Sequence, residues 1–233
     1  MSRIPSTLAV LNDEIVNCTK CPRLVEYRQQ VGREKRRAYL EWDHWARPVP
    51  GFGDPNAPVL VLGLAPGAHG SNRTGRPFTG DASGKFMYPI LYKVGFASQP
   101  TAEDRNDGLK LIDCYITAAV RCAPPDNKPL PSELANCAPF LDRELAILNH
   151  VKVVVALGKI GFDAYLNCLK RTGVLTSKAG YVFGHEARYM MPTGVVLLAS
   201  YHPSNQNTAT KKLTAKMFEG VFRRAREIAA GTA

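Results

Sequence analysis

A long glycine-rich loop carries the side chains best suited to chemistry. It follows the apolar run 59–64, extends to Asp81, and contains Phe78, whose ring can stack on a flat heterocycle. The Asp81 carboxylate can hold a water or face a developing cation, and His202, which follows another apolar run, can donate to a leaving group that gathers negative charge. This combination suits cleavage of the bond between a sugar and a planar base, whose transition state resembles an oxocarbenium ion.

Each of these residues also has a structural interpretation. Phe78 can pack in the core, Asp81 can cap the helix expected near residue 84, and His202 can hydrogen-bond within its loop. It is less expected that all three residues, on one rim of the fold, have only structural roles than that they form a functional site. The loop lacks the Lys-Ser/Thr ending of a P-loop and the G-x-G-x-x-G spacing of a dinucleotide fold, which argues against nucleotide hydrolysis.

Four of the six cysteines are spaced as metal ligands. Cys18 and Cys21 form a C-x-x-C pair, whereas Cys122 and Cys137 have fourteen residues between them. Four thiolates satisfy a structural zinc or an iron–sulfur cluster, and the wide second spacing favours the cluster because zinc ribbons pair two C-x-x-C knuckles. The alternative is four unrelated buried thiols. The remaining cysteines lie in apolar runs and are predicted to be core residues: Cys114 and Cys168.

The composition indicates a folded, basic protein. The 233 residues include 30 Lys and Arg against 20 Asp and Glu, a net charge of +10, and 45% are hydrophobic, which excludes global disorder. This charge is compatible with nucleic-acid binding, although the basic run 33–37 is equally explained as a solvated helix face. No apolar run approaches the roughly 20 residues of a membrane span. Asp13 and Glu14 stand where a signal peptide is apolar, so we expect a cytoplasmic protein.

Four continuous apolar runs predict the strands that position these residues. They cover 59–64, 114–120, 151–157 and 195–200, and such runs are typical of parallel strands buried on both faces. Helices are predicted at 4–17, with Ser6 as N-cap, and at 23–40, 84–94, 131–148, 160–169 and 207–229. The alternation predicts a three-layer α/β/α fold with a short four-stranded parallel sheet. We expect one domain, 1–233, with a helical extension at 1–50 and an α/β body at 51–233.

Four motifs of this chain resemble those of the uracil-DNA glycosylase superfamily. They are Gly63-Leu64-Ala65-Pro66-Gly67 running to Thr79-Gly80-Asp81, Arg121-Cys122-Ala123-Pro124-Pro125, Leu157-Gly158-Lys159, and His202-Pro203-Ser204-Asn205-Gln206-Asn207-Thr208. The resemblance extends from Cys18 to about Lys212. The cysteine spacing is similar to that of the iron–sulfur branches, which implies a 4Fe-4S cluster that staples the N-terminal extension to the body through Cys18, Cys21, Cys122 and Cys137.

One departure selects the branch within this superfamily. Relatives of narrow specificity carry a polar residue just after the first glycine or an Asp close behind it, whereas this chain has Leu64-Ala65, as the type-B (family 5) enzymes do. The resemblance implies a monofunctional base-excision-repair glycosylase that removes uracil and other deaminated bases, such as hypoxanthine and xanthine, from DNA. It implies that Asp81 takes the water-activating role, that Asn127 contributes a second polar group and that His202 stabilises the departing base. The implied base pocket comprises Gly63, Leu64, Ala65, Pro66, Gly67 and Phe78.

The loop after His202 is predicted to contact DNA. Flipping a base out of a duplex vacates a place in the stack, which Gln206 or Asn207 can fill. Further predicted contacts are Ser204, Asn205 and the phosphate-binding cations Arg73, Arg76, Lys211 and Lys212, for each of which ordinary surface charge is the alternative. A monomer is expected. Two other functions stay open: a non-catalytic iron–sulfur protein that binds DNA or senses redox state, and a zinc-stapled enzyme acting on free nucleosides.

Overall fold

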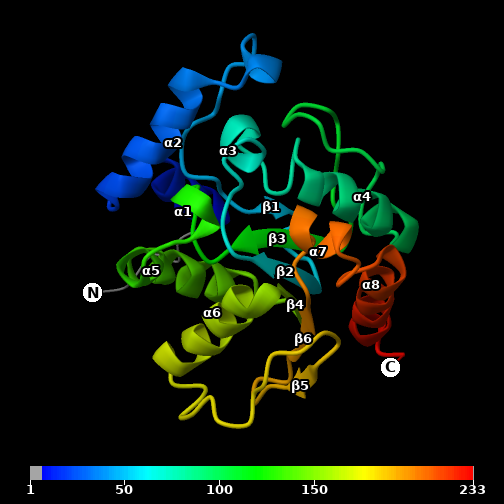
Figure 1. Cartoon of the computed structure of the whole chain (residues 1–233). Helices are drawn as coiled ribbons and strands as arrows, with labels where there is room; N and C mark the ends of the chain where they lie inside the picture. The colour runs from blue at the N-terminus through cyan, green and yellow to red at the C-terminus, as the bar shows by residue number, and fades with distance from the viewer. Residues whose placement is uncertain (1–6, 233) are drawn as a thin grey trace.

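A mixed sheet forms the centre of the protein, whose residues 7–232 are described by a computed structural model (Figure 1). The strand order is β1-β3-β2-β4-β6-β5. The neighbouring pairs from β3 to β6 are all parallel. These central strands are the four apolar runs: β2 (Val59–Gly63), β3 (Cys114–Ala118), β4 (Val153–Leu157) and β6 (Val196–Ser200). Their Val, Leu and Ile side chains are buried on both faces, as a sheet between two helical layers requires.

Two short antiparallel strands extend the sheet beyond the predicted four. β1 (Phe52–Gly53) pairs with β3, and β5 (Arg188–Met190) pairs with β6. The prediction of a four-stranded, wholly parallel sheet is therefore wrong: the sheet has six strands, and the strand at each edge is antiparallel to its neighbour. The physical reason is the absence of an apolar run: β1 is two residues long in a Pro/Gly-rich segment, and β5 is largely exposed.

Alternating side chains of the central strands pack against two different helical layers. Val59 and Val61 face the layer of α4 (Ala82–Val94) and α8 (Ala215–Ala230). Leu60 and Leu62 face the layer of α5 (Pro131–Ile147) and α6 (Gly158–Arg171). This follows from the two-residue period of a strand. The result is the expected α/β/α layering, with the helices of each layer visible on either side of the sheet in Figure 1.

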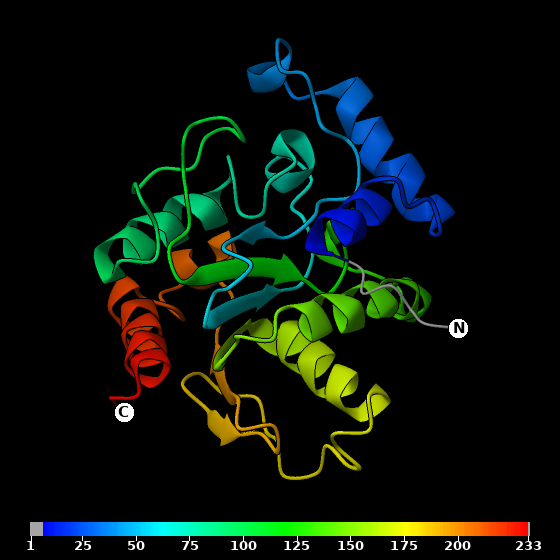
Figure 2. The ribbon, with the colours of Figure 1, turned by 180° about the vertical axis from the view of Figure 1, so that it is seen from behind.

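The N-terminal helices dock on the α5 side of the body. α1 (Leu8–Val16) lies along α5, where Leu11 and Ile15 pack against Phe140 (Figure 2). α2 (Pro22–Glu34) is joined to α5 by the ion pair of Arg23 with Glu133, at 2.7 Å. It is followed by the short 3-10 helix η1 (Arg37–Tyr39).

Several helix boundaries differ from the sequence-based prediction. Thr7 caps α1 through its side chain, and the predicted cap Ser6 lies outside the described residues. The predicted helix 23–40 ends at Glu34 because Lys35 adopts a φ of 37°, and the predicted helix 207–229 is two helices, α7 (Asn205–Ala209) and α8. A short helix in the glycine-rich loop, α3 (Ser71–Thr74), was not predicted. Across residues 7–232, no helix is both long and apolar enough to cross a membrane.

Candidate active site

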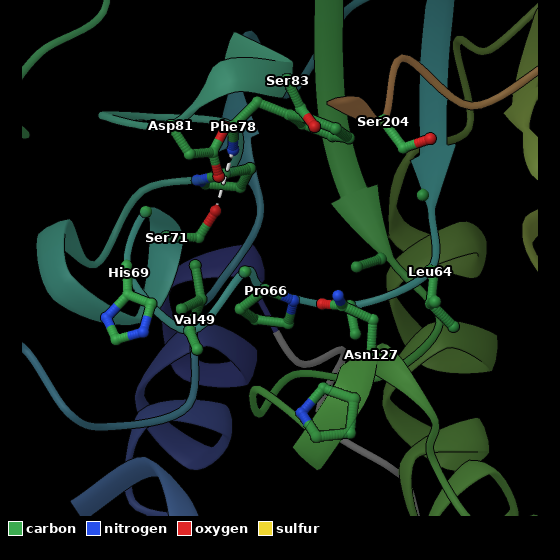
Figure 3. A pocket seen from close by; sticks show the side chains of 18 of the residues that line it. Val49, Leu64, Pro66, His69, Ser71, Phe78, Asp81, Ser83, Asn127 and Ser204 are labelled. Carbon is green, nitrogen blue, oxygen red and sulfur yellow. Dashed lines mark hydrogen bonds between the residues drawn. The ribbon is translucent and has the colours of Figure 1, made fainter. Parts of the chain in front are cut away.

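A cavity of about 740 Å³ opens where the chain leaves the carboxyl ends of β2 and β3. Its walls come from the glycine-rich loop, the segment after β3 and the loop after β6, so the strand ends meet at one edge as the parallel pairing requires. Figure 3 shows part of this lining. The six residues of the predicted base pocket all line the cavity: Gly63, Leu64, Ala65, Pro66, Gly67 and Phe78.

Asp81 has both of the roles that the sequence left open, a helix cap and a cavity residue. As N-cap of α4 its Oδ1 accepts a hydrogen bond from the backbone N–H of Gly84 at 2.9 Å. Its Oδ2 lies against Gly67 and Gly70, two residues that also line the cavity. Burial raises the pKa of Asp81, while hydrogen bonds from the N–H groups of Gly84 and Ser83 act in the opposite direction.

The rings of His202 and Phe78 lie close together in the lining of the cavity. Their ring centroids are 5.8 Å apart, with the ring planes inclined at 34°. The backbone N–H of Phe78, a residue with φ of 51°, donates to Ser71 Oγ at 3.0 Å, the dashed line in Figure 3. Burial lowers the pKa of His202 to about 4, so at neutral pH its imidazole is uncharged and carries one N–H donor.

Asn127 reaches the cavity from the segment after β3. It ends a 3-10 turn that begins at Pro125, and both Asp126 (φ 53°) and Asn127 (φ 56°) adopt left-handed backbone conformations. Asn and Asp are the non-glycine residues that tolerate this conformation best. The turn therefore depends on its residue types to present an amide at the cavity.

The loop after β6 forms another wall. Ser204 caps α7, accepting from the N–H of Asn207 at 3.3 Å, and lines the cavity with the exposed Asn205 and Gln206. The Asn207 side chain instead donates to the carbonyl of His202 at 2.9 Å, an internal role that fixes the histidine loop. The two predicted phosphate-binding lysines of this region are exposed: Lys211 and Lys212.

The predicted phosphate contacts of Arg73 and Arg76 are wrong. Only 3% of Arg73 and 4% of Arg76 is exposed. The Arg73 guanidinium donates to the carbonyls of His69 and Gly80, at 2.9 and 3.0 Å, and Arg76 forms an ion pair with Asp107 at 2.7 Å. Both arginines therefore hold the glycine-rich loop in shape and are not available to DNA.

A second, small cavity is lined by the four cysteines predicted as ligands. Cys18 lies just before α2, Cys21 caps that helix, Cys122 follows β3, and Cys137 lies on α5. All four thiols therefore meet at one cavity. Burial raises the pKa of Cys122, and the three other thiols add to the increase. Within residues 7–232 no three His, Cys, Asp or Glu side chains are grouped as ligands of one metal ion. An iron–sulfur cluster does not require such a group, because each of its thiolates binds a different iron. The donor set fits a thiolate-bound group, because four thiols and no carboxylate line the cavity.

The other two cysteines are buried core residues, which confirms their prediction. Cys114 is fully buried beneath α4 and α8, and Cys168 is 2% exposed on α6.

Some cavity residues were not predicted as site residues. Tyr27 and Arg36 come from the N-terminal extension, and His69 and Asp126 come from loops already singled out. The basic run around Arg36 was a signal for the extension, but it did not indicate that α2 and the segment after it reach the cavity.

The comparisons with known proteins agree with this geometry. A sequence profile described as "Uracil DNA glycosylase superfamily" matches residues 50–226, most of the chain. This chain belongs to that superfamily. Its sequence is 53% identical to a "Type-5 uracil-DNA glycosylase" of Thermus thermophilus over 212 residues, covering 91% of this chain and 94% of the relative.

More distant members of the superfamily align over similar lengths. A "Type-5 uracil-DNA glycosylase" of Pyrobaculum aerophilum is 44% identical over 91% of this chain and 89% of its own. A "Type-4 uracil-DNA glycosylase" of Sulfurisphaera tokodaii is 26% identical over 96% of this chain and 85% of its own. The resemblance seen in the motifs thus extends over nearly the whole chain.

Proposed function

We propose that this chain is a DNA-repair uracil-DNA glycosylase that hydrolyses the bond between uracil and deoxyribose and leaves an abasic site. The observation that carries the proposal is the meeting of Asp81, Phe78 and His202 at one cavity, in a chain whose named relatives are uracil-DNA glycosylases. An apolar ring, a carboxylate and an uncharged imidazole are the groups that an extruded base and a cationic sugar require.

Each of these residues has a distinct part in the reaction. Phe78 stacks on the extruded base. His202 donates its single N–H to the base as negative charge gathers there, and because the imidazole is uncharged it stabilises the leaving group without transferring a proton. Asp81, with Oδ1 held by the α4 backbone, uses Oδ2 to orient water and to face the developing positive charge on the sugar. Asn127 supplies a second polar group to the reacting centre.

The base pocket supports a broad specificity. Leu64 and Ala65 put no charged or amide side chain beside the first strand end, so at this position a different base leaves no buried side-chain donor or acceptor unpaired. We therefore extend the proposed substrates to hypoxanthine and xanthine in DNA.

We also propose that the four clustered cysteines hold a 4Fe-4S cluster. When bound, the cluster cross-links the N-terminal helices to the segment after β3 and to α5 through Cys18, Cys21, Cys122 and Cys137. Burial raises the pKa of Cys122 and Cys137, and two buried arginines oppose this shift: the charge of Arg28 acts on Cys122 and that of Arg121 on Cys137. We also propose that DNA is the partner of this chain and that the protein acts as a cytoplasmic monomer.

The proposal is tested by cleavage of a labelled duplex that carries one uracil opposite guanine, followed by alkali to break abasic sites. We expect a product that depends on alkali and that His202→Ala abolishes, whereas His150→Ala, at an exposed histidine outside the cavity, leaves it unchanged. Folded wild-type protein that binds the duplex and yields no product would refute glycosylase activity. Cleavage of free nucleosides in place of DNA would instead indicate a nucleoside hydrolase.

A further inference from the structure

The proposed reaction gives no role to the basic segment 33–37, which we call the basic hook. It contains Arg33, Lys35, Arg36 and Arg37 against a single carboxylate, Glu34. The hook joins α2 to η1, and in both ribbon views this part of the chain projects beyond the sheet at the end where α3 lies (Figures 1 and 2). A surface with this charge density needs a physical explanation.

The charges of the hook are not neutralised by the rest of the protein. Arg33, Arg36 and Arg37 are exposed, and within residues 7–232 none of them forms an ion pair. Lys35 is turned back, donating from Nζ to the carbonyl of Leu40 at 3.0 Å. Three guanidinium groups are therefore left free to meet anions from solution.

Arg36 connects the hook to the active site. Alone among the hook residues it lines the 740 Å³ cavity. Burial lowers the pKa of His69, a residue of the glycine-rich loop, and the charge of Arg36 adds to this shift. Arg36 is both exposed and part of the lining, so it lies at the rim of the cavity.

The segment that follows the hook packs against the loop that carries Asp81. The buried Arg73 guanidinium lies 4.2 Å from the ring centroid of Tyr39 and 3.9 Å from that of Trp42, two aromatic residues that follow the hook. Arg73 then donates to the carbonyls of His69 and Gly80. This cation–π arrangement joins the hook to the catalytic loop, so that little ordering entropy is lost when a ligand binds.

We propose that the basic hook binds the phosphate backbone of the DNA strand beside the extruded nucleotide, with Arg36 as the contact nearest the cavity. The inference rests on the proposed function and deepens it, because it names the element that holds the damaged strand. Arg36 replaces the buried Arg73 and Arg76 as a phosphate-binding residue on this rim. The loop of Asn205 and Gln206 lines the same cavity from a different segment, so the strand is held by two separate parts of the chain.

The test measures the salt dependence of binding to a duplex carrying an abasic-site analogue opposite guanine, which the enzyme cannot turn over. Fluorescence anisotropy is recorded from 50 to 200 mM salt for wild type, Arg36→Gln and Arg36→Lys. The control is Arg224→Gln, an exposed arginine on α8 that does not line the cavity. The slope of log K against log salt is negative, and loss of one phosphate contact makes it shallower by about 0.9. When the salt rises from 50 to 200 mM, the factor by which affinity falls is therefore roughly 3-fold smaller for Arg36→Gln than for wild type.

We expect Arg36→Lys to keep the wild-type slope, because the charge remains, and Arg224→Gln to match wild type. In single-turnover cleavage of the uracil duplex, Arg36→Gln raises the protein concentration needed for half-maximal rate by a larger factor than it lowers the maximal rate. Equal slopes for Arg36→Gln and wild type, with both proteins folded by thermal melting, would overturn the proposal. A wild type that binds the analogue but never cleaves uracil DNA would refute the proposed function and leave the hook intact.

Discussion

Replacing Gly70 by alanine tests whether the position of the Asp81 carboxylate sets the reaction rate. A Cβ at residue 70 would lie 2.1 Å from Asp81 Oδ2 and 2.6 Å from both its Cβ and Cγ. Non-bonded carbon atoms separate to about 3.5 Å, so Asp81 must move by roughly 1 Å. A rotation of the carboxylate alone cannot relieve the contact, because Asp81 Cβ is also too close, and the cap bond to Gly84 holds the side chain on the other side.

A displacement of this size has a predictable cost. Moving a catalytic group by about 1 Å lowers a rate by roughly 100-fold, or about 2.7 kcal/mol of transition-state stabilisation. Gly67 offers a graded comparison in the same loop, because a Cβ there would lie 3.0 Å from Asp81 Oδ2 and requires a shift of only a few tenths of an ångström. We expect Gly67→Ala to lower the rate by less than about 10-fold on the same scale.

The assay is single-turnover cleavage of the uracil–guanine duplex with protein in excess, run beside thermal melting and anisotropy binding. If Gly70→Ala acts through the carboxylate, then Asp81→Ala lowers the rate at least as much while leaving binding less affected, and adding Gly70→Ala to Asp81→Ala costs nothing further. A folded Gly70→Ala protein with the wild-type rate would refute the reasoning. So would a double variant whose losses simply add.

Three further predictions concern stability. Glu144→Ala leaves the Arg121 charge buried without its partner and lowers the unfolding free energy by about 3–5 kcal/mol in denaturant titrations; a loss below 1 kcal/mol would contradict the importance of the pair. Burial holds the pKa of His202 at about 4 in the folded protein, below its ordinary 6.5. Protonation of this histidine therefore favours the unfolded state, so the unfolding free energy is highest above pH 6.5 and decreases as the pH falls toward 4. The difference in unfolding free energy between wild type and His202→Asn should shrink over that window, and a constant difference would exclude this titration. Cys122→Ser should lose bound iron and melt at lower temperature, whereas Cys168→Ser keeps its iron; equal iron contents would refute the ligand assignment.

The central strands could be predicted from sequence because each is a continuous apolar run. A strand buried on both faces needs apolar side chains at every position, and Val153–Leu157 is a pattern that few other elements produce. The edge strands β1 and β5 carry no such requirement. They form because β3 and β6 have unpaired backbone N–H and C=O groups at the sheet edges. These free groups arise only when the sheet assembles, so the sequences of β1 and β5 give no sign of the pairing.

The candidate site divides along the same line. Asp81, Phe78 and His202 follow strand ends, and parallel strands bring such positions together, so their proximity was predictable. The fate of Arg73 was not, because its burial depends on aromatic rings more than thirty residues away in the chain. In the sequence, an arginine in a glycine-rich loop has the pattern of a phosphate-binding residue. Only the fold shows that other side chains cover Arg73. The segment after α2 supplies these rings and also brings Arg36 to the cavity.

The docking of α1 on α5 bears on the order in which the chain acquires structure during synthesis. Leu11 and Ile15 have Phe140 as their buried partner, and Glu14 pairs with Arg143, 129 residues later. Because the ribosome synthesises about 5–20 residues per second, α1 is made several seconds or more before α5. For that interval the first helix exposes its apolar face, and the nascent chain has to avoid aggregation or engage a chaperone. α1 is therefore made well before the helix on which it packs, and it is among the later elements to fold.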